Sequence, residues 1–496
     1  MEQSQIAADR ELNILETNLR LGRAEYFLKR SYLRSMPRML GLVLGNACNA
    51  CNIDCPHCYQ EKNGDNLLRP ADIGQQLRRE FLSLYPYLAT LWIQGGQALA
   101  YAGFRELVED VASVTRRPLL SIATNGTLID DKWAERMVRL PFSSVTVSID
   151  GGTPDTYART RRGSSLPLVL ANVARIRKWK EKLNSLRPAL DSFFVVLRSN
   201  FREIPLYFKL MYENGFTDIA LQTVEINRAN SAREPLLAEN ETITDHRDVA
   251  ELFALMREAL PHARRCFRQV RVSGLQTLFE THGYDASFLL EQENGLYPDS
   301  DGLAAQDAGE GDAQMPGEAS GFELCPNPWT TLFIAENGGV HLCFLSEPVG
   351  NLYEAPLVEI WNSPQAIAKR LRMIRGNYMA SGCSSNWCPR AREKPQIHCP
   401  PNVTGRLREE AMTAAEMAAP FPILGQGPVP SGLTAVRRVL SENTRRLAEM
   451  EHVVQAMDEE FQRMRRSVLV RAAAHLARKW DRLSGRSTLS RKSRIE

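Results

Sequence analysis

Residues 38–59 read RMLGLVLGNACNACNIDCPHCY, in which a short apolar run, LGLVLG, leads directly into four cysteines. Similar apolar runs recur up to residue 225, each too short for a helix and bounded by residues that turn a chain. These further runs are TLWIQGG, LLSIATNG, SVTVSIDG, SFFVVLRSN and DIALQTVE. Stretches with helical spacing separate them, so the sequence predicts an α/β fold with six strand–helix units, a partial (β/α)6 barrel. In such barrels the chemistry lies where the strands end.

The composition limits the class of protein. The chain has 496 residues, which is too many for one hydrophobic core, because single cores stop growing at roughly 250–300 residues. No apolar run approaches the roughly 18 residues that a membrane-spanning helix needs. The first residues, MEQSQIAADRELN, lack the basic and apolar parts of a secretory signal. We therefore expect a cytoplasmic protein, and with a net charge of +3 no nucleic-acid partner is predicted.

The cysteines indicate metal binding. Disulfides are rare in the cytosol, so ten cysteines there are better explained as metal ligands. Nine of them fall in two groups, and the tenth, Cys266, is expected to be a buried side chain.

The first group lies directly after the first predicted strand. Cys51, Cys55 and Cys58 have the spacing C-x3-C-x2-C, and three thiolates can ligate three irons of a [4Fe–4S] cubane, which leaves the fourth iron open. An open iron is what a catalytic cluster needs. Cys48 allows two rival interpretations, a zinc site or a closed four-cysteine cluster for electron transfer, but its simplest role is that of a bystander.

The pattern around these cysteines resembles the signature of the radical S-adenosylmethionine (SAM) superfamily. His57 precedes the last cysteine and Tyr59 follows it. At the next strand end, Gly95-Gly96-Gln97 resembles the Gly-Gly-Glu of that family, which receives the methionine amino group of SAM. Gln97 departs from the pattern, and an uncharged amide oxygen is expected to bind an ammonium less strongly than a carboxylate does.

The resemblance continues over about 190 residues and implies contacts with SAM at later strand ends. Asn125 lies in Thr-Asn-Gly-Thr, Ser148 and Asp150 lie in Ser-Ile-Asp-Gly, and Arg161 resembles the arginine that pairs with the cofactor carboxylate. Asn200 closes the fifth strand in a similar way. The cofactor-binding residues that the resemblance implies are His57, Tyr59, Gly95, Gly96, Gln97, Asn125, Ser148, Asp150 and Arg161. Singly, each of these motifs would indicate only a turn or a surface charge.

The second group of cysteines follows an acidic stretch. Asn-Gly-Gly at 337–339 predicts a hairpin that brings Cys325 and Cys343 together, and zinc is an alternative metal there. The segment resembles the SPASM or twitch domain of radical SAM enzymes through Gly338 before Cys343 and the phrases Gly-Asn-Leu and Trp-Asn-Ser. The resemblance implies one auxiliary [4Fe–4S] cluster. Its ligands would be Cys325, Cys343, Cys383 and Cys388, with Cys399 as the substitute for the last.

The rest of the chain indicates association. Apolar residues recur at alternating spacings of three and four over 433–468, with Asn443 as the polar insertion, which favours a coiled coil and a homodimer over a helix docked on its own core. The basic end could rest on an anionic membrane surface or be a solvated helix end. The predicted parts are N-terminal helices at 1–37, a TIM-like partial barrel at 38–235, a helical extension at 236–290, an acidic flexible linker at 291–323, a SPASM-like or twitch-like iron–sulfur domain at 324–400, a Pro/Gly linker at 401–432, a coiled coil at 433–485 and a basic tail at 486–496.

The resemblance implies reductive cleavage of SAM to a 5′-deoxyadenosyl radical that takes hydrogen from a substrate. An auxiliary cluster would then aid a two-electron oxidation, with an external electron donor such as flavodoxin or ferredoxin. We expect an oxidoreductase acting on a small polar substrate, such as a sugar derivative. The alternatives are a maturase that modifies a peptide or protein, an iron–sulfur electron carrier without SAM chemistry, and a scaffold that functions through its coiled coil.

Overall fold

A computed structural model describes the chain in several stretches. The described residues are 2–43, 51–59, 80, 83–101, 103–115, 117–226, 231–232, 234–289, 324–335, 337–344 and 346–377. Cys48, Cys383, Cys388, Cys399, both linkers, the coiled coil and the basic tail lie outside them, so what the sequence predicts there stays a prediction.

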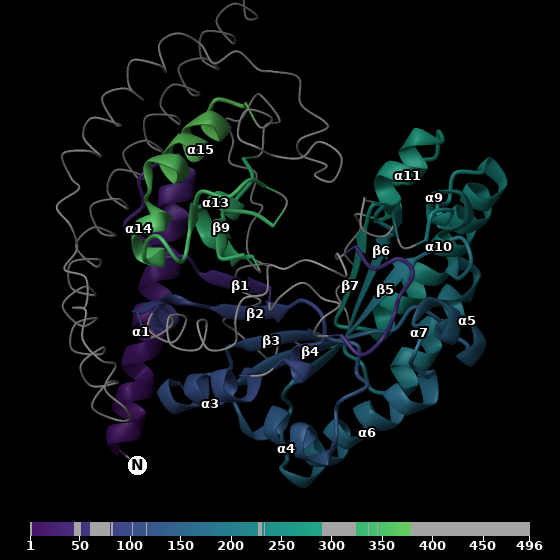
Figure 1. Ribbon diagram of the computed structural model, residues 1–496, viewed down its shortest axis with the longest axis horizontal. Helices are drawn as coiled ribbons and strands as arrows, with labels where there is room; N and C mark the ends of the chain where they lie inside the picture. The colour runs from purple at the N-terminus through teal and green to yellow at the C-terminus, as the bar shows by residue number, and fades with distance from the viewer. Residues whose placement is uncertain are drawn as a thin grey trace, which may run out of the picture.

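Seven parallel strands that follow one another in chain order form most of a ten-stranded sheet (Figure 1). They are β1 (Met39–Val43), β2 (Thr90–Gln94), β3 (Leu120–Thr124), β4 (Phe142–Ser148), β5 (Ala189–Val196), β6 (Asp218–Thr223) and β7 (Gln269–Ser273). The six predicted strands are β1–β6, and the prediction of an α/β fold with a mostly parallel sheet is confirmed. Among the described strands the sheet is open, with β10 and β7 at its two edges.

The strand β7 corrects the prediction that residues 236–290 form a purely helical extension. Its sequence, QVRVS, carries no long apolar run. Every residue of the strand is exposed or half-buried, because β7 pairs only with β6 among the described strands. An edge strand of this kind lacks the continuous apolar pattern by which buried parallel strands are recognised.

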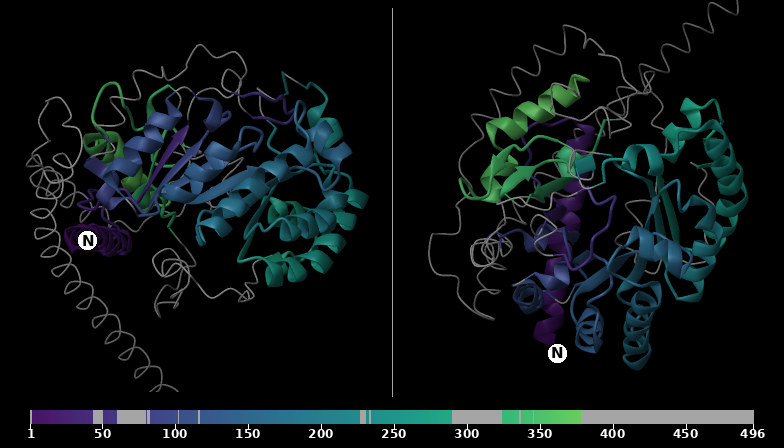
Figure 2. Two further views of the ribbon diagram at one scale, coloured as in Figure 1. Left: turned by 90° about the horizontal axis from the view of Figure 1, so that it is seen from below. Right: turned by 45° about the vertical axis from the view of Figure 1, so that its right-hand side comes forward.

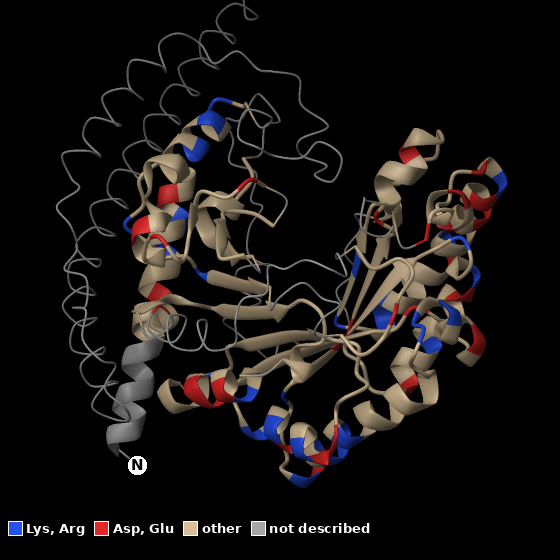
Figure 3. Cartoon of the chain, in the orientation of Figure 1, with Lys and Arg blue, Asp and Glu red and all other residues tan. Residues whose placement is uncertain are grey.

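Helices cover the outer face of the curved parallel sheet, as the views in Figures 1 and 2 agree. They are α3 (Phe104–Val114), α4 (Asp131–Arg139), α6 (Leu166–Lys182), α7 (Ile204–Glu213) and α10 (His246–Cys266). Each turns an apolar face inward: Val108 of α3, Met137 of α4 and Val173 of α6 are completely buried in the core. Cys266, the last residue of α10, is half-buried against this core. Figure 3 shows that many of the charged residues among those described lie on the helices outside the sheet.

Shorter elements and a long first helix complete the described fold. The α-helices are α1 (Glu2–Phe27), α5 (Pro154–Thr160), α9 (Leu237–Glu241), α11 (Leu275–Thr281), α13 (Asn327–Thr330), α14 (Leu357–Trp361) and α15 (Pro364–Ile374). Single 3-10 turns lie at Tyr85–Tyr87, Ala98–Ala100, Phe201–Glu203 and Ser287–Leu289. In the part of the chain that the structure describes, no helix combines the length and apolar character needed to cross a bilayer.

The segment after residue 323 extends the sheet at the free edge of β1. Strand β8 (Thr331–Ile334) lies parallel to β1, and β9 (Gly339–His341) pairs antiparallel with β8. Strand β10 (Gly350–Asn351) then pairs with β9. The predicted hairpin at Asn-Gly-Gly is therefore confirmed, and its turn places Gly338 at a φ of 79°, a conformation that favours glycine.

The Trp-Asn-Ser phrase joins this segment to the chain that precedes β1. The Trp361 indole donates to the Ser35 carbonyl at 2.7 Å, and the Asn362 amide exchanges hydrogen bonds with the Leu33 backbone at 3.0 and 2.6 Å. Arg370, which is completely buried, donates to the carbonyls of Pro328, Ser31 and Trp361 at 2.7, 3.1 and 2.9 Å. Three separate chain segments therefore meet at this guanidinium.

Replacing this arginine should loosen the junction. We expect Arg370→Met to lower the free energy of unfolding by about 2–3 kcal/mol, because three carbonyl oxygens lose their donor and a buried acceptor left unsatisfied costs about 1–3 kcal/mol. Urea denaturation of the reconstituted protein measures the change. Arg375→Met, on the exposed end of α15, is the matched control and should change it by less than about 0.5 kcal/mol. Equal effects of the two variants would show that the buried guanidinium does not hold the junction.

Candidate functional site

The carboxyl ends of the parallel strands meet at one edge of the sheet. Val43 at the end of β1 lies in register with Gln94 at the end of β2, and Val196 of β5 with Thr223 of β6. The predicted cofactor contacts follow these ends. Gly95 and Gly96 come directly after β2, Asn125 directly after β3, Ser148 ends β4 and Asp150 lies two residues beyond it. Both glycines have a positive φ, 101° and 54°, so the chain turns sharply after β2.

The cysteine loop, defined as residues 51–59, lies against these strand ends. The Asn125 side-chain amide donates to the Cys51 sulfur at 3.8 Å, and the Arg161 guanidinium donates to the Cys55 sulfur at 3.6 Å. The Cys58 backbone amide donates to the Cys55 carbonyl at 3.2 Å. Two of the three predicted thiol ligands therefore already receive N–H donors, which stabilise a thiolate.

Three thiols on one loop are suitable ligands for an iron–sulfur cluster, because such clusters are held by cysteine thiolates. Burial raises the pKa of Cys55 to about 11 and also raises the pKa of Cys51. Such thiols become ligands when a metal ion replaces the proton, because a coordinating thiol is deprotonated outright. Among the described residues no three Cys, His, Asp or Glu side chains stand close enough to bind one ion as they are. In a cubane each of the three cysteines ligates a different iron, so the three thiols do not have to share one ion.

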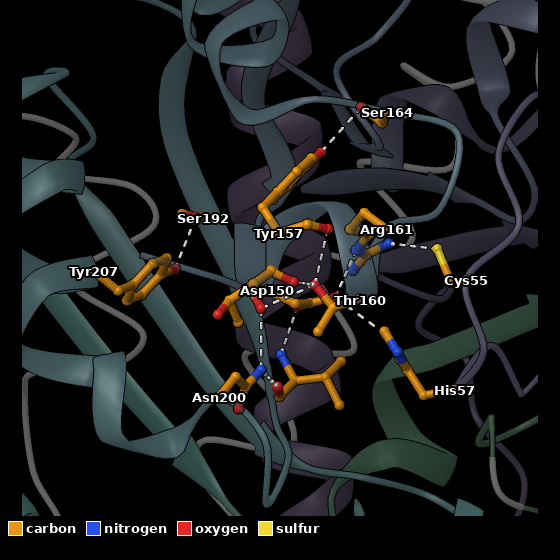
Figure 4. Close-up of polar contacts among 12 residues, drawn as sticks. Cys55, His57, Asp150, Tyr157, Thr160, Arg161, Ser164, Ser192, Asn200 and Tyr207 are labelled. Carbon is orange, nitrogen blue, oxygen red and sulfur yellow. Dashed lines mark hydrogen bonds and ion pairs between the residues drawn. The ribbon is translucent and has the colours of Figure 1, made fainter. Parts of the chain in front are cut away.

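A buried ion pair lies beneath this loop (Figure 4). The Asp150 carboxylate contacts the Arg161 guanidinium at 2.5 Å and His57 Nε2 at 3.1 Å, and it accepts from the Val195 backbone amide at 2.7 Å. Burial by itself would raise the pKa of Asp150, but Arg161 and the hydrogen bonds hold it below its ordinary value. Asn200 donates to the Asp150 carbonyl at 3.1 Å and holds the same loop.

This ion pair gives Asp150 and Arg161 partners within the protein. Asp150 is completely buried, and Arg161 spans from its carboxylate to the Cys55 sulfur. Their predicted contacts with SAM stay predictions. From the sequence the two residues were expected as separate SAM contacts, and their pairing was not predicted.

A chain of amide and hydroxyl groups connects the ends of β2 and β3 with the cysteine loop. Gln97, completely buried, accepts from the Thr124 hydroxyl at 2.7 Å and donates through Nε2 to Asn125 Oδ1. The Asn125 Nδ2 donates to Asn52 Oδ1 at 3.0 Å, and Thr127 donates to Asn125 Oδ1. The sequence analysis quoted both threonines in their motif but gave them, and Asn52, no role.

An aromatic contact connects the two groups of cysteines. The ring of Tyr59, next to Cys58, meets the ring of Phe344 edge to face at a centroid distance of 6.2 Å. Phe344 follows Cys343 in the chain, and the Cys343 sulfur accepts from the Asn327 amide at 3.5 Å. Cys325 lies half-buried just before α13. The two cysteine-bearing segments therefore touch, which the sequence could not show.

Comparisons with known proteins agree with this geometry. Residues 46–182 match the family model of the radical SAM superfamily, and residues 325–389 match that of SPASM, an iron–sulfur cluster-binding domain. The GTP 3′,8-cyclase of Mycolicibacterium smegmatis is 29% identical over 129 residues, which is 25% of this chain and only 35% of the cyclase. The pre-heme d1 synthase of Dinoroseobacter shibae is 24% identical over 364 residues, 71% of this chain and 81% of the synthase.

Solved structures are also similar to the chain, and one of them serves as an example. Streptococcus suis SuiB bound to S-adenosylmethionine superposes with a TM-score of 0.46 at 13% sequence identity, covering 70% of this chain and 68% of SuiB.

Proposed function

Since this chain is a member of the radical SAM superfamily that carries a C-terminal SPASM domain, we propose that it oxidises a small polar molecule by two electrons. The two domains imply a [4Fe–4S] cluster with SAM and an auxiliary iron–sulfur cluster. When bound, the first cluster and SAM supply a 5′-deoxyadenosyl radical for hydrogen abstraction, and the auxiliary cluster supplies a one-electron acceptor. Radical SAM enzymes need an electron donor, and a flavodoxin or ferredoxin is our candidate.

The cysteine loop is the observation that carries the proposal. Cys51, Cys55 and Cys58 would hold the first cluster, with N–H donors aimed at the first two sulfurs. Gly95 and Gly96 turn the chain sharply at the adjacent strand end, where the methionine part of SAM would bind. The protein's own residues thus bind and orient the cofactors and keep the thiolates in a buried, hydrogen-bonded setting.

The contact between Tyr59 and Phe344 supports a role for the second segment in the same reaction. Cys325 and Cys343 would hold the auxiliary cluster together with Cys383 and Cys388. Because the ring beside Cys58 touches the ring beside Cys343, a substrate at the strand ends would lie near both cysteine groups. In the proposed reaction the substrate loses one hydrogen atom and then one electron and one proton.

The residues before β1 pack on the main fold. Those residues form α1, whose Asn18 donates to the Met36 and Tyr87 carbonyls at 3.0 and 3.2 Å. They are thus packed into the main fold. A sugar derivative remains the narrower expectation.

A tetrapyrrole is a second candidate substrate. The match to the pre-heme d1 synthase covers 71% of this chain, and the name of that protein indicates a heme precursor. At 24% identity this relative supports the substrate class as a proposal only.

The reduced protein, incubated with SAM and a small-molecule fraction of cell extract, should release 5′-deoxyadenosine together with a product two mass units lighter than its precursor. Mass spectrometry detects both, and a purified sugar and tetrapyrrole panel then separates the two candidates. Turnover supported only by a peptide or protein fraction would reject the small-molecule proposal, and a protein that holds its clusters but cleaves no SAM would be an electron carrier.

A further inference from the structure

The hydrogen bonds around Gln97 have a direction that two backbone groups set. The Gly126 backbone amide donates to the Thr124 hydroxyl oxygen at 3.1 Å, so that hydroxyl directs its own hydrogen to Gln97 Oε1. The Thr127 backbone amide donates to Asn125 Oδ1 at 3.0 Å, so this atom of Asn125 is the oxygen. A backbone N–H can only donate. These contacts therefore identify the oxygen and the nitrogen of both side-chain amides.

With those ends set, position 97 needs a side chain that accepts one hydrogen bond and donates another. Gln97 must accept from Thr124 and donate to Asn125, and a glutamine side chain has one acceptor and one donor group in the required places. An ionised glutamate has no donor, so it would place a carboxylate oxygen against Asn125 Oδ1. Gln97 is also completely buried, so its replacement by a charge would be costly.

The orientation of Asn125 determines which of its atoms faces the cysteine loop. Because Oδ1 of Asn125 faces Gln97 and Thr127, its Nδ2 faces Asn52 and the Cys51 sulfur, to which it donates at 3.8 Å. Hydrogen bonds to the sulfurs of an iron–sulfur cluster influence its reduction potential. The side chain at position 97 thus acts on Cys51 through Asn125.

We propose that Gln97 is a positioning residue that orients Asn125 toward the ligand sulfur of Cys51, and that it is not a direct acceptor for the methionine ammonium of SAM. The proposal rests on the proposed role of Cys51 as a cluster ligand. It explains why this chain has glutamine where glutamate was expected: a glutamate would turn Asn125 over and remove the N–H donor from the Cys51 sulfur.

The test compares the cluster in Gln97→Glu, Asn125→Leu and the double variant, without SAM. The midpoint potential, followed by electron paramagnetic resonance, should become more negative in Gln97→Glu and in Asn125→Leu, since a donor to sulfur is lost in both. The stretching frequency of the iron–sulfur(cysteine) bond should rise in both. Gln97→Met, which keeps the size of the side chain without a charge, should shift both readouts less, because Thr127 still orients Asn125.

The double variant distinguishes an effect of the Asn125 orientation on the midpoint potential from an effect of the new charge at position 97. If Gln97 acts through Asn125, then Gln97→Glu adds no further shift in the Asn125→Leu background, whereas a bare effect of the new charge would add to it. Gln276→Glu makes the same chemical change at a half-buried position of α11, where Gln276 donates to Glu280, and should leave the potential unchanged. A shift of the same size in the single and the double background would overturn the proposal.

The affinity for SAM tests the opposing assignment, in which Gln97 binds the methionine ammonium directly. A direct ammonium acceptor would bind SAM more tightly as glutamate, because a charge-assisted hydrogen bond is roughly twice as strong as a neutral one. A several-fold tightening in Gln97→Glu with an unchanged potential would therefore overturn our assignment. The iron content of each sample is measured alongside, so a wild-type protein that binds no cluster would reject the proposed function instead.

Discussion

The Cys55→Ala protein should release no 5′-deoxyadenosine above background when it is reduced and incubated with SAM under anaerobic conditions. Cys55 is the buried member of the three predicted ligands, and its sulfur is held by Arg161. Two thiolates cannot replace three, because an iron that loses its protein ligand is open to solvent and the cubane is no longer held. Chromatography of the reaction mixture measures the nucleoside.

The iron content tests the same assignment without turnover. Reconstituted protein should hold roughly eight irons, and a Cys51/Cys55/Cys58 triple alanine variant roughly four, since each cubane has four. Cys48→Ala is the matched control within the same segment and should keep its iron and its activity. Cleavage that survives in Cys55→Ala, or that disappears in Cys48→Ala alone, would overturn the ligand assignment. Zinc in the C-terminal segment would refute the auxiliary cluster.

Arg161→Met should destabilise the protein by about 3–5 kcal/mol, because removal of one partner leaves the other buried charge uncompensated. Asp150 is completely buried, and among the described residues its carboxylate would keep His57 and the Val195 amide as partners. The free energy of unfolding comes from chemical denaturation of the reconstituted protein at pH 7. Arg162→Met is the matched control: its partner is Glu234 at 3.0 Å on the surface, and such pairs contribute about 0–1 kcal/mol.

The pH dependence of the stability of Arg161→Met follows from the titration of the Asp150 carboxyl group. In the natural protein the pKa of Asp150 is lower in the folded state than in the unfolded state. The ionised carboxylate therefore stabilises the fold at a pH above the unfolded pKa, and this stabilisation is lost as the pH falls through the folded pKa. Without Arg161, burial dominates and raises that pKa instead, so the folded variant loses stability as the pH rises above the ordinary value. The difference in the free energy of unfolding between the natural protein and Arg161→Met should therefore become smaller from pH 7 to pH 5. A difference that stays constant would indicate that the loss of packing, and not of charge, is responsible.

Local patterns were sufficient for much of the fold and of the candidate site. The strands β1–β6 are short apolar runs because a parallel sheet buries both of its faces, and that requirement is visible in the sequence. The Asn-Gly-Gly hairpin was predictable because the turn requires particular residue types. The cysteine loop was predictable because the spacing of its ligands lies within one short segment.

Contacts between distant segments depended on the tertiary structure. Asp150 and Arg161 were both found in the sequence, but their pairing with each other and with His57 depends on how one loop packs on another. Likewise, Tyr59 and Phe344 lie far apart in the chain, and they meet because β8 aligns beside β1 and carries the second cysteine group to the first.

The amino-acid sequence alone therefore determined the parallel α/β sheet, the hairpin and the cysteine-bearing loops, because each depends on residue types a few positions apart. Only the tertiary structure showed the edge strand β7, in which half-buried Val270 and Val272 alternate with exposed polar residues, and the hydrogen bonds of Gln97. From the sequence, Gln97 was expected to bind the SAM ammonium less strongly than the glutamate of the family pattern does. Its burial and the donors around it, which come from other strand ends, make an amide the side chain that completes the network.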